Sequence, residues 1–188
     1  VWGPQSRNHA EKFMNMKRNN IIEFGSAQFD VYKISPRLSK EKIILDHGLN
    51  PDNPTLLYAG TSKETDEFSH LCIIDDAIKK GIFPKFNIIY RPHPWGAGGK
   101  NPSRFIDHTF DNVAIDNSMK SYLLNIEKGN KTFYSADYLD TRDILSAVEG
   151  VISPLSTILV EAMIIGIPPL CLMPIDDEDA FHFQLAYN

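Results

Sequence analysis

The sequence predicts an α/β protein with a doubly wound parallel sheet from about Thr55 onward. Short apolar runs alternate with segments whose apolar residues recur at helical spacing. The short runs are apolar at successive positions, which is typical of parallel strands that are buried on both faces. A chain of 188 residues with 43% hydrophobic content can bury such a core. These observations favour a parallel sheet that is covered by helices on both sides.

The first part of this region supplies two strands and the helix between them. TLLYAG, Thr55–Gly60, is a short apolar strand that ends in a glycine. In 68–82 the apolar residues recur at helical spacing, and Gly81 closes the helix. FNIIY, 86–90, is the second strand.

After a loop, the alternation of strand and helix continues. NVAID is a third strand, and YLDTRDILSAVEG has a helical pattern. VISP is a strand that its proline ends, LSTILVEAMIIG is a helix that a glycine ends, and PPLCLM is the last strand. These five segments occupy 112–116, 138–150, 151–154, 155–166 and 168–173.

Two smaller parts precede this domain. Residues 1–33 contain VWG, a helical segment SRNHAEKFMN and the run NIIEFG, and we expect them to form one β-α-β unit. Such a unit cannot bury its own apolar face. Residues 34–54 hold three prolines and a charged run, which is the composition of a linker with room for one helical turn.

Charge and composition exclude several classes of protein. The net charge is −5 and basic residues are scattered, so no basic face is available to bind nucleic acid. Cys72 and Cys171 lie in apolar contexts and cannot form a disulfide framework, which fits a reducing compartment. Prolines, a glycine and a glutamate interrupt Val151–Pro174, which argues against a membrane span. The start has no signal-peptide pattern and no initiating Met, so we expect a fragment of a longer protein.

The first polar motif, AGTSKET, follows the first strand. In open parallel sheets, ligands bind beyond the carboxyl ends of the strands. Gly60 would allow a ligand to approach the backbone, and Thr61 and Ser62 offer hydroxyls and amides. By itself the motif favours an ordinary helix N-cap, because Ser and Thr prefer that position.

The second motif, RPHP, follows the second strand. Its two prolines fix two φ angles and hold Arg91 and His93 in extended geometry. A cation and an imidazole held at a strand end suit a phosphate or a carboxylate. The alternative is a stiff surface loop with a solvated histidine, and the motif alone does not separate the two. WGAGGK, which comes next, is compatible with a flap over the site.

The third motif, SPLSTILVEA, carries the strongest signal. A strand ends at Pro154, and Ser156 with Thr157 then opens a helix whose free N–H groups favour an anion. Glu161 lies one turn further along the same face and can accept hydrogen bonds from a sugar diol. It is the only charge in this apolar stretch, so we favour a function for it over a partly exposed position on a helix.

Two other acidic clusters favour structural explanations. Asp140, Thr141 and Asp143 are typical of a helix N-cap with an acid in its first turn. PIDDEDAFHF has four acids before a helix, but no partner ligands are spaced for a metal. We therefore expect no metal site.

The three motifs in this order resemble a known family. YAGTS, YRPHP and YLDTRDILSAVEGVISPLSTILVEAMIIGIPPL are similar to the Rossmann-like, nucleotide-binding C-terminal half of GT-B glycosyltransferases. Among these, the chain resembles bacterial surface-polysaccharide enzymes: the CDP-glycerol glycerophosphotransferases of teichoic acid synthesis, and the sialyl- and Kdo-type transferases with an HP motif and an S-x-x-S/T loop. The resemblance covers nearly the whole chain. It implies that 1–33 ends a truncated N-terminal domain and that 55–188 is a nucleotide-binding domain truncated at its C-terminus.

The resemblance also implies a function. It predicts a glycosyltransferase-type enzyme that takes a CDP-, CMP- or UDP-linked sugar or glycerol donor and a polysaccharide or lipid-linked acceptor. His93 and Arg91 would face the donor phosphate, and Glu161 would hold the ribose. The donor-site residues that it implies are Gly60, Thr61, Arg91, His93, Ser153, Ser156, Thr157 and Glu161.

Further properties follow from the same resemblance. Such enzymes act without a metal or another cofactor, in the cytoplasm, at the inner face of the membrane when the acceptor is lipid-linked. The general base is expected in the missing N-terminal half. No catalytic residue is therefore assigned, and we expect the fragment to be inactive alone.

Two alternatives remain open from the sequence. UDP-GlcNAc 2-epimerases share the fold and a related E-A-x-x-x-G-x-P ending, here 161–168. The other alternative is a non-catalytic α/β interaction module whose motifs are only caps and turns.

Overall fold

A computed structural model describes residues 1–61, 65–94, 102–105, 107–127 and 137–172. The chain divides into two compact units, Val1–Ser35 and Pro36–Asn188. Each unit is described separately below.

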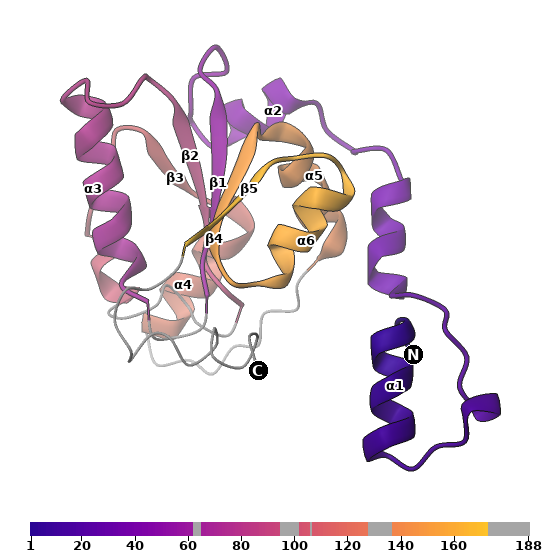
Figure 1. Cartoon of the computed structure of the whole chain (residues 1–188). Helices are drawn as coiled ribbons and strands as arrows, with labels where there is room; N and C mark the ends of the chain where they lie inside the picture. The colour runs from indigo at the N-terminus through magenta and orange to yellow at the C-terminus, as the bar shows by residue number, and fades with distance from the viewer. Residues whose placement is uncertain (62–64, 95–101, 106, 128–136, 173–188) are drawn as a thin grey trace. The chain divides into compact units, whose positions relative to one another are not determined.

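The second unit is built on one five-stranded sheet in which every strand is parallel to its neighbours (Figure 1). The strand order is β3-β2-β1-β4-β5. The strands are β1 Thr55–Ala59, β2 Asn87–Arg91, β3 Val113–Ile115, β4 Gly150–Pro154 and β5 Pro169–Leu172. The five strands predicted from the sequence and the doubly wound fold class are confirmed.

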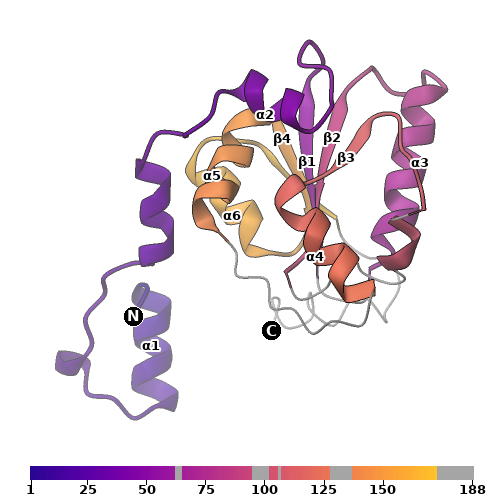
Figure 2. The same ribbon diagram turned by 180° about the vertical axis from the view of Figure 1, so that it is seen from behind.

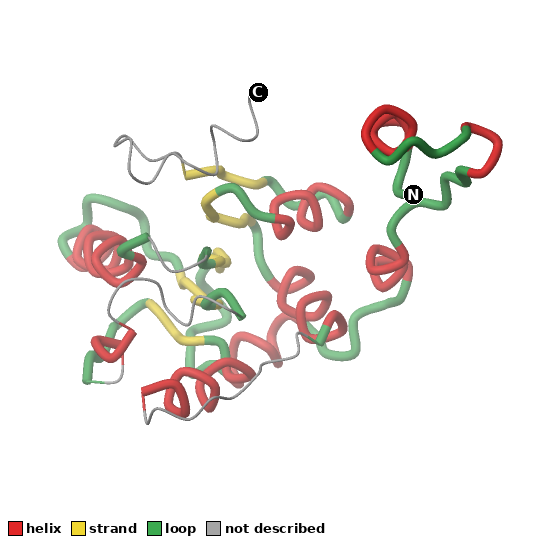
Figure 3. The backbone as a smooth tube through the Cα atoms, turned by 90° about the horizontal axis from the view of Figure 1, so that it is seen from below, coloured by secondary structure: helices red, strands yellow, loops and turns green. Residues whose placement is uncertain are grey.

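Helices cover both faces of this sheet (Figure 3). The helix α3, Glu67–Lys79, lies on one face, whereas α5, Tyr138–Ala147, and α6, Thr157–Ile164, lie on the other. The predicted helices agree with these three. The described residues outside the predicted helices add α4, Asn117–Glu127, and the short 3-10 helix η3, Pro102–Phe105.

The helix α4 was missed by the sequence analysis. It begins directly after β3, as Figure 2 shows from behind. Its buried side chains are Met119, Tyr122 and Leu123, which are spaced as one helical face requires. Polar residues fill the positions between them, so the apolar pattern is narrow and gave too weak a signal.

The segment 34–54 differs from the expected linker, because from Pro36 it packs into the second unit. It contains α2, Lys40–Asp46, whose N-cap Ser39 accepts a hydrogen bond from the backbone N–H of Lys42 at 3.2 Å. Ile43 and Ile44 are buried, and the helix packs against α5. Two adjacent isoleucines were enough apolar surface to anchor this helix.

The first unit contains the helix of the expected β-α-β unit but not its two strands. It holds α1, Pro4–Phe13, and the 3-10 helices η1, Arg18–Asn20, and η2, Ala27–Lys33; its described residues form no strand. The N-terminal ammonium of Val1 donates to the backbone oxygen of Ile22 at 2.8 Å, and the backbone N–H of Phe24 donates to the oxygen of Val1 at 3.0 Å. This is the pattern of a parallel pair, limited to one residue. The helix was predicted correctly, but its flanks are too short to form strands.

The core of the second unit lies against the central strands. Leu57 and Tyr58 of β1 and Ile88, Ile89 and Tyr90 of β2 are fully buried. The chain order reverses at β1, which has β2 on one side and β4 on the other. The carboxyl ends of β1 and β4 therefore flank the topological switch point, where open α/β sheets bind ligands.

Candidate functional site

The turn after β1 is held by a buried carboxylate. The N–H of Gly60 donates to the oxygen of Arg91 at 2.9 Å and continues the ladder with β2. The next residue, Thr61, donates its N–H to Oε1 of Glu67 at 2.6 Å. A Cβ on Gly60 would lie 2.4 Å from Oε2 of Glu67. The glycine thus leaves room for this carboxylate. The approach of a ligand to Gly60, which the sequence suggested, remains a prediction.

Glu67 is a site residue that the sequence analysis missed. It begins α3 directly after the N-cap Asp66, and its side chain turns back under the end of β1. It is 0% exposed, and the hydroxyl of Tyr90 donates to its Oε2. Burial raises the pKa of Glu67 to about 7, although the hydrogen bonds from Tyr90 and Thr61 act to lower it. The available signal was an acid at the first helical position after a strand–glycine turn.

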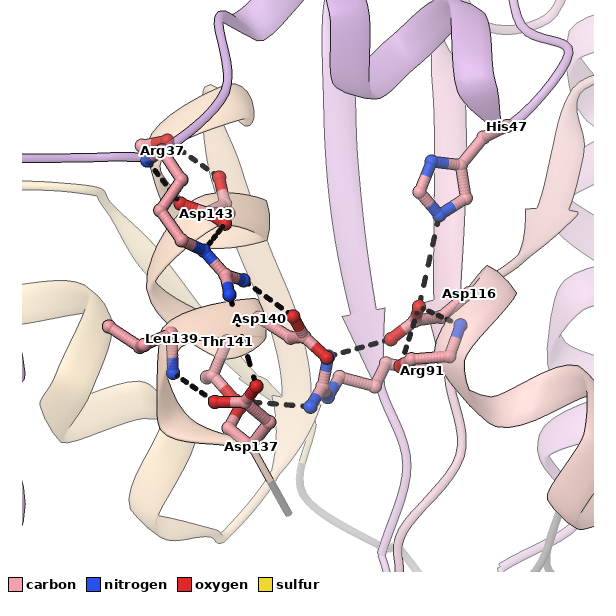
Figure 4. A network of polar contacts seen from close by, with 11 residues as sticks. Arg37, His47, Arg91, Asp116, Asp137, Leu139, Asp140, Thr141 and Asp143 are labelled. Carbon is pink, nitrogen blue, oxygen red and sulfur yellow. Dashed lines mark hydrogen bonds and ion pairs between the residues drawn. The ribbon is translucent and has the colours of Figure 1, made fainter.

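Arg91 belongs to a different network, on the opposite face of the sheet. Successive strand residues point to opposite faces, so Arg91 and Tyr90 diverge. Nη1 of Arg91 lies 2.7 Å from Oδ2 of Asp116, and its Nη2 donates to the hydroxyl of Thr141 at 3.1 Å (Figure 4). The arginine is 7% exposed. Its guanidinium is committed to this buried ion pair, which the sequence did not predict.

Asp116 is held ionised by its neighbours. Burial alone would raise its pKa, but His47, the charge of Arg91 and two hydrogen bonds from Ser118 lower it. The N–H and the hydroxyl of Ser118 donate to Oδ1 of Asp116 at 3.0 and 2.9 Å. The Nε2 atom of His47 lies 3.9 Å from the same oxygen. Asp116 therefore binds a cation from β2 and anchors the start of α4.

A second arginine extends this polar region toward α5. Arg37 donates from Nε to Asp143 at 2.7 Å and from Nη2 to Asp140 at 2.5 Å (Figure 4). The hydrogen bonds to Asp140 and Asp143 raise the pKa of Arg37. A pocket of about 190 Å³ opens here; its lining includes Arg37, His47, Asp116, Asn117, Asp140 and Asp143.

The acidic cluster in 137–143 has a structural role, as the sequence favoured, with one correction. The N-cap of α5 is Asp137, which accepts from the N–H of Leu139 at 2.8 Å. Asp140 lies in the first turn of the helix. The hydroxyl of Thr141 donates to the backbone oxygen of Asp137 at 3.1 Å and also accepts the hydrogen bond from Arg91. The cap thus lies earlier in the chain than the sequence analysis placed it.

His93 follows β2 and is half-buried. Burial lowers its pKa, which favours the neutral imidazole at neutral pH. The hydroxyl of Tyr122, on α4, donates to the backbone oxygen of Pro94 and links the residues after β2 to α4. His93 thus lies just beyond a strand end, and its rigidity remains a prediction. Its contact with a phosphate remains a prediction.

Ser153, near the carboxyl end of β4, and Ser156, which follows the strand, are brought together. The hydroxyls of Ser153 and Ser156 lie 3.0 Å apart, and Ser153 is fully buried. Ser156 is the N-cap residue of α6, yet its side chain makes no cap hydrogen bond. Thr157 is exposed at the first helical position, and the first turn contains no acid. The start of α6 thus presents backbone N–H groups at the switch point, as predicted.

Glu161 occupies the second turn of α6 and is 5% exposed. The expectation of a non-solvated carboxylate is therefore met, while its contact with a ribose remains a prediction. Three features of the sequence analysis lie outside the described residues: the segment WGAGGK, the serine of AGTSKET and the acidic segment 174–183.

In the described residues, no three His, Cys, Asp or Glu side chains are grouped as ligands of a metal ion. Metal independence remains a prediction. No helix in the same part of the chain combines the length and apolar character needed to cross a membrane.

Comparison with solved structures identifies similar folds. The wall teichoic acid polymerase TagF matches 88% of this chain with a TM-score of 0.50 and 16% identity. The match spans 37% of TagF, so this chain corresponds to well under half of that protein. The β-Kdo 2,4-transferase KpsC of Thermosulfurimonas dismutans matches 79% of this chain and 46% of its own length, at 14% identity and a TM-score of 0.39, which is too low to bear on the fold. No protein-family model and no curated protein matches the sequence.

These findings define the class of fold. The chain has a GT-B glycosyltransferase-like α/β fold, and its structural neighbours include a polymerase of wall teichoic acid. The family resemblance drawn from the sequence motifs is confirmed at the level of the fold.

Proposed function

We propose that this chain is the donor-binding part of a glycosyltransferase-type enzyme of surface-polysaccharide or glycolipid synthesis. It binds a CDP-, CMP- or UDP-linked sugar or glycerol at the switch point between β1 and β4. The acceptor is a polysaccharide or a lipid-linked chain, presented at the cytoplasmic face of the membrane. No metal takes part, since N–H groups and hydroxyls can stabilise the leaving nucleotide.

The start of α6 is the observation that carries this proposal. Two helices begin near the switch point, α3 after β1 and α6 after β4. Asp66 caps α3 and accepts from the N–H of Ser69 at 3.2 Å, and Glu67 adds a second acid. The first turn of α6 has neither a side-chain cap nor an acid. Its N–H groups and positive dipole end are therefore available to an external anion.

The remaining residues take roles around that anion. Ser156 and Thr157 bind the phosphate through hydroxyl and amide, with Ser153 orienting Ser156 through the 3.0 Å contact. Neutral His93 donates a hydrogen bond to a phosphate oxygen. Glu161 accepts from the ribose hydroxyls.

Two further parts of the site contribute without a side-chain hydrogen bond to the donor. The turn of Gly60 and Thr61 lines the cleft opposite α6. Arg91 contributes its positive charge from within the ion pair with Asp116, where Nη1 donates to Asp116 and Nη2 donates to Thr141.

Calorimetric titration of the chain with CMP, CDP, UMP and UDP tests the proposal. We expect one nucleotide to bind saturably, and His93→Ala and Glu161→Gln each to weaken it about tenfold, which corresponds to one lost hydrogen bond. Asp76→Asn, exposed on α3, is the matched control and should bind like wild type.

Circular dichroism confirms that each variant is folded. A folded chain that binds none of the four nucleotides contradicts the proposal. Binding that neither substitution weakens would favour an interaction module whose motifs are only caps and turns.

A further inference from the structure

The carboxylate of Glu67 lies beneath the proposed donor site, and the described part of the chain places no cation in an ion pair with it. Its two hydrogen-bond donors are the N–H of Thr61 and the hydroxyl of Tyr90, and both are neutral. Among the described residues, no lysine, arginine or histidine forms an ion pair with it. In the part of the chain that the structure describes, its ionised form therefore has no charge compensation in a buried environment.

The titratable groups on the surrounding elements do not change this balance. On β1, Tyr58 shares its hydroxyl with Nδ1 of His70 on α3 at 2.8 Å. Also on α3, Asp66 is negative, and Arg104 of η3 approaches Asp66 at 3.5 Å instead of Glu67. Burial and the charge of Glu67 both raise the pKa of Tyr90, so the hydroxyl stays neutral. The proton is thus the ready source of compensation for Glu67.

The proposed ligand would add negative charge next to this group. The Glu67 carboxylate contacts Thr61 and fills the space over Gly60, two residues of the proposed donor site after β1. A nucleotide phosphate at the start of α6 lies across the same switch point. Two unscreened negative charges in this region repel each other, and protonation of the carboxylate relieves the repulsion.

We propose that Glu67 is a positioning residue of the donor site, which holds the Gly60–Thr61 turn and takes up one proton from solvent as the anionic donor binds. This inference rests on the proposed function. The carboxylate becomes a carboxylic acid, and no other bond changes. Either oxygen of the acid can still accept the N–H of Thr61, so the turn stays in place while its charge falls.

The coupling between proton uptake by Glu67 and nucleotide binding has a definite sign and size. Burial places the pKa of the unliganded Glu67 at about 7. If the anion raises this pKa by about one unit, binding at pH 7.5 takes up about half a proton. Affinity is then highest below pH 7 and falls up to about tenfold as the pH rises through 8.

Isothermal titration calorimetry with UDP and CDP, in buffers of different ionisation enthalpy at pH 7.5, measures this uptake. We expect wild type to take up about half a proton per bound nucleotide. The Glu67→Gln variant, which keeps an acceptor for Thr61, should lose this proton uptake. The His93→Gln variant should retain the uptake. The ionisation of the nucleotide itself is the same for both proteins and cancels in the difference.

The other outcomes overturn the inference. Nucleotide binding without uptake, or with equal uptake in wild type and Glu67→Gln, excludes Glu67 as the proton acceptor and leaves the proposed function intact. Uptake lost only in His93→Gln assigns the proton to the histidine. If a folded chain binds neither nucleotide at any pH from 6 to 8, the proposed function fails and this inference fails with it.

Discussion

Two buried carboxylates lie near the carboxyl end of β2, on opposite faces of the sheet, and they differ in the partners that stabilise their negative charge. Asp116, on the α5 side, is 2% exposed and pairs with Arg91 at 2.7 Å. Glu67, on the α3 side, is fully buried and has only neutral donors. The pKa of Asp116 is lowered, whereas that of Glu67 is raised to about 7.

The difference follows from the partners and not from the degree of burial. Desolvation acts to raise both pKa values, and it is the largest single contribution for each group. For Asp116, the hydrogen bond with His47, the charge of Arg91 and the hydrogen bonds from Ser118 together outweigh desolvation, whereas the two hydrogen bonds to Glu67 do not. Asp116 is therefore a fixed charge that joins β2 to the start of α4. Glu67 is a group that can exchange a proton near neutral pH.

Breaking the fixed pair should have the largest effect. Arg91→Met leaves Asp116 buried without its cation, and we expect a loss of about 3–5 kcal/mol of unfolding free energy at pH 7. Urea unfolding followed by circular dichroism measures it. The loss should shrink as the pH falls through the folded-state pKa of Asp116, because a carboxyl with a depressed pKa stabilises only while it is ionised.

The double variant Arg91→Met/Asp116→Asn is the control for this experiment. It removes the uncompensated charge and should recover part of the loss. If Arg91→Met alone lowers the unfolding free energy by less than about 1 kcal/mol, the ion pair of Arg91 and Asp116 is solvated and not buried.

Removing the other carboxylate should change the pH dependence of stability. The pKa of Glu67 is about 7 in the fold against 4.5 ordinarily, so ionisation of this group destabilises the folded state. Wild-type stability should fall between pH 4.5 and 7 by at most about 3 kcal/mol from this source. Glu67→Gln lacks this decrease, so its stability relative to wild type rises over the same interval.

The same urea experiment, repeated at several pH values, tests this expectation. Glu149→Gln is a suitable control, because this half-exposed acid pairs with Lys40 at the amino end of the sheet. Parallel pH profiles for wild type and Glu67→Gln would show that Glu67 is already ionised at low pH.

The sheet was predictable because its strands are apolar runs that end at glycine or proline, as at Gly60 and Pro154. The start of α6 was predictable for a similar reason, since a proline-ended strand followed by Ser156 and Thr157 defines a helix start locally. Local chemistry therefore located the proposed donor site.

The two carboxylate networks were not predictable in the same way, since they depend on pairing between distant segments. Arg91 meets Asp116 because β2 and β3 are parallel neighbours in the register that joins Tyr90 to Ile115. A shift of one residue would place the two side chains on different faces. Glu67 meets Tyr90 through a comparable tertiary contact.

The smallest expected change in stability comes from removing the Tyr90 hydroxyl, which donates a hydrogen bond to Glu67. Tyr90→Phe removes one hydrogen bond to the carboxylate, and we expect a loss of about 1–2 kcal/mol at pH 8, where Glu67 is ionised, and a smaller loss at pH 6. The variant keeps the ring in the core, where it stacks on Phe105 at 4.7 Å. In a double-mutant cycle with Glu67→Gln, the pH dependence of this loss should disappear, because the titrating group is absent. Equal losses at pH 6 and pH 8 in the Tyr90→Phe variant alone would mean that Glu67 does not change its charge in this interval. The contrast with Asp116 would then rest on hydrogen bonding and not on charge.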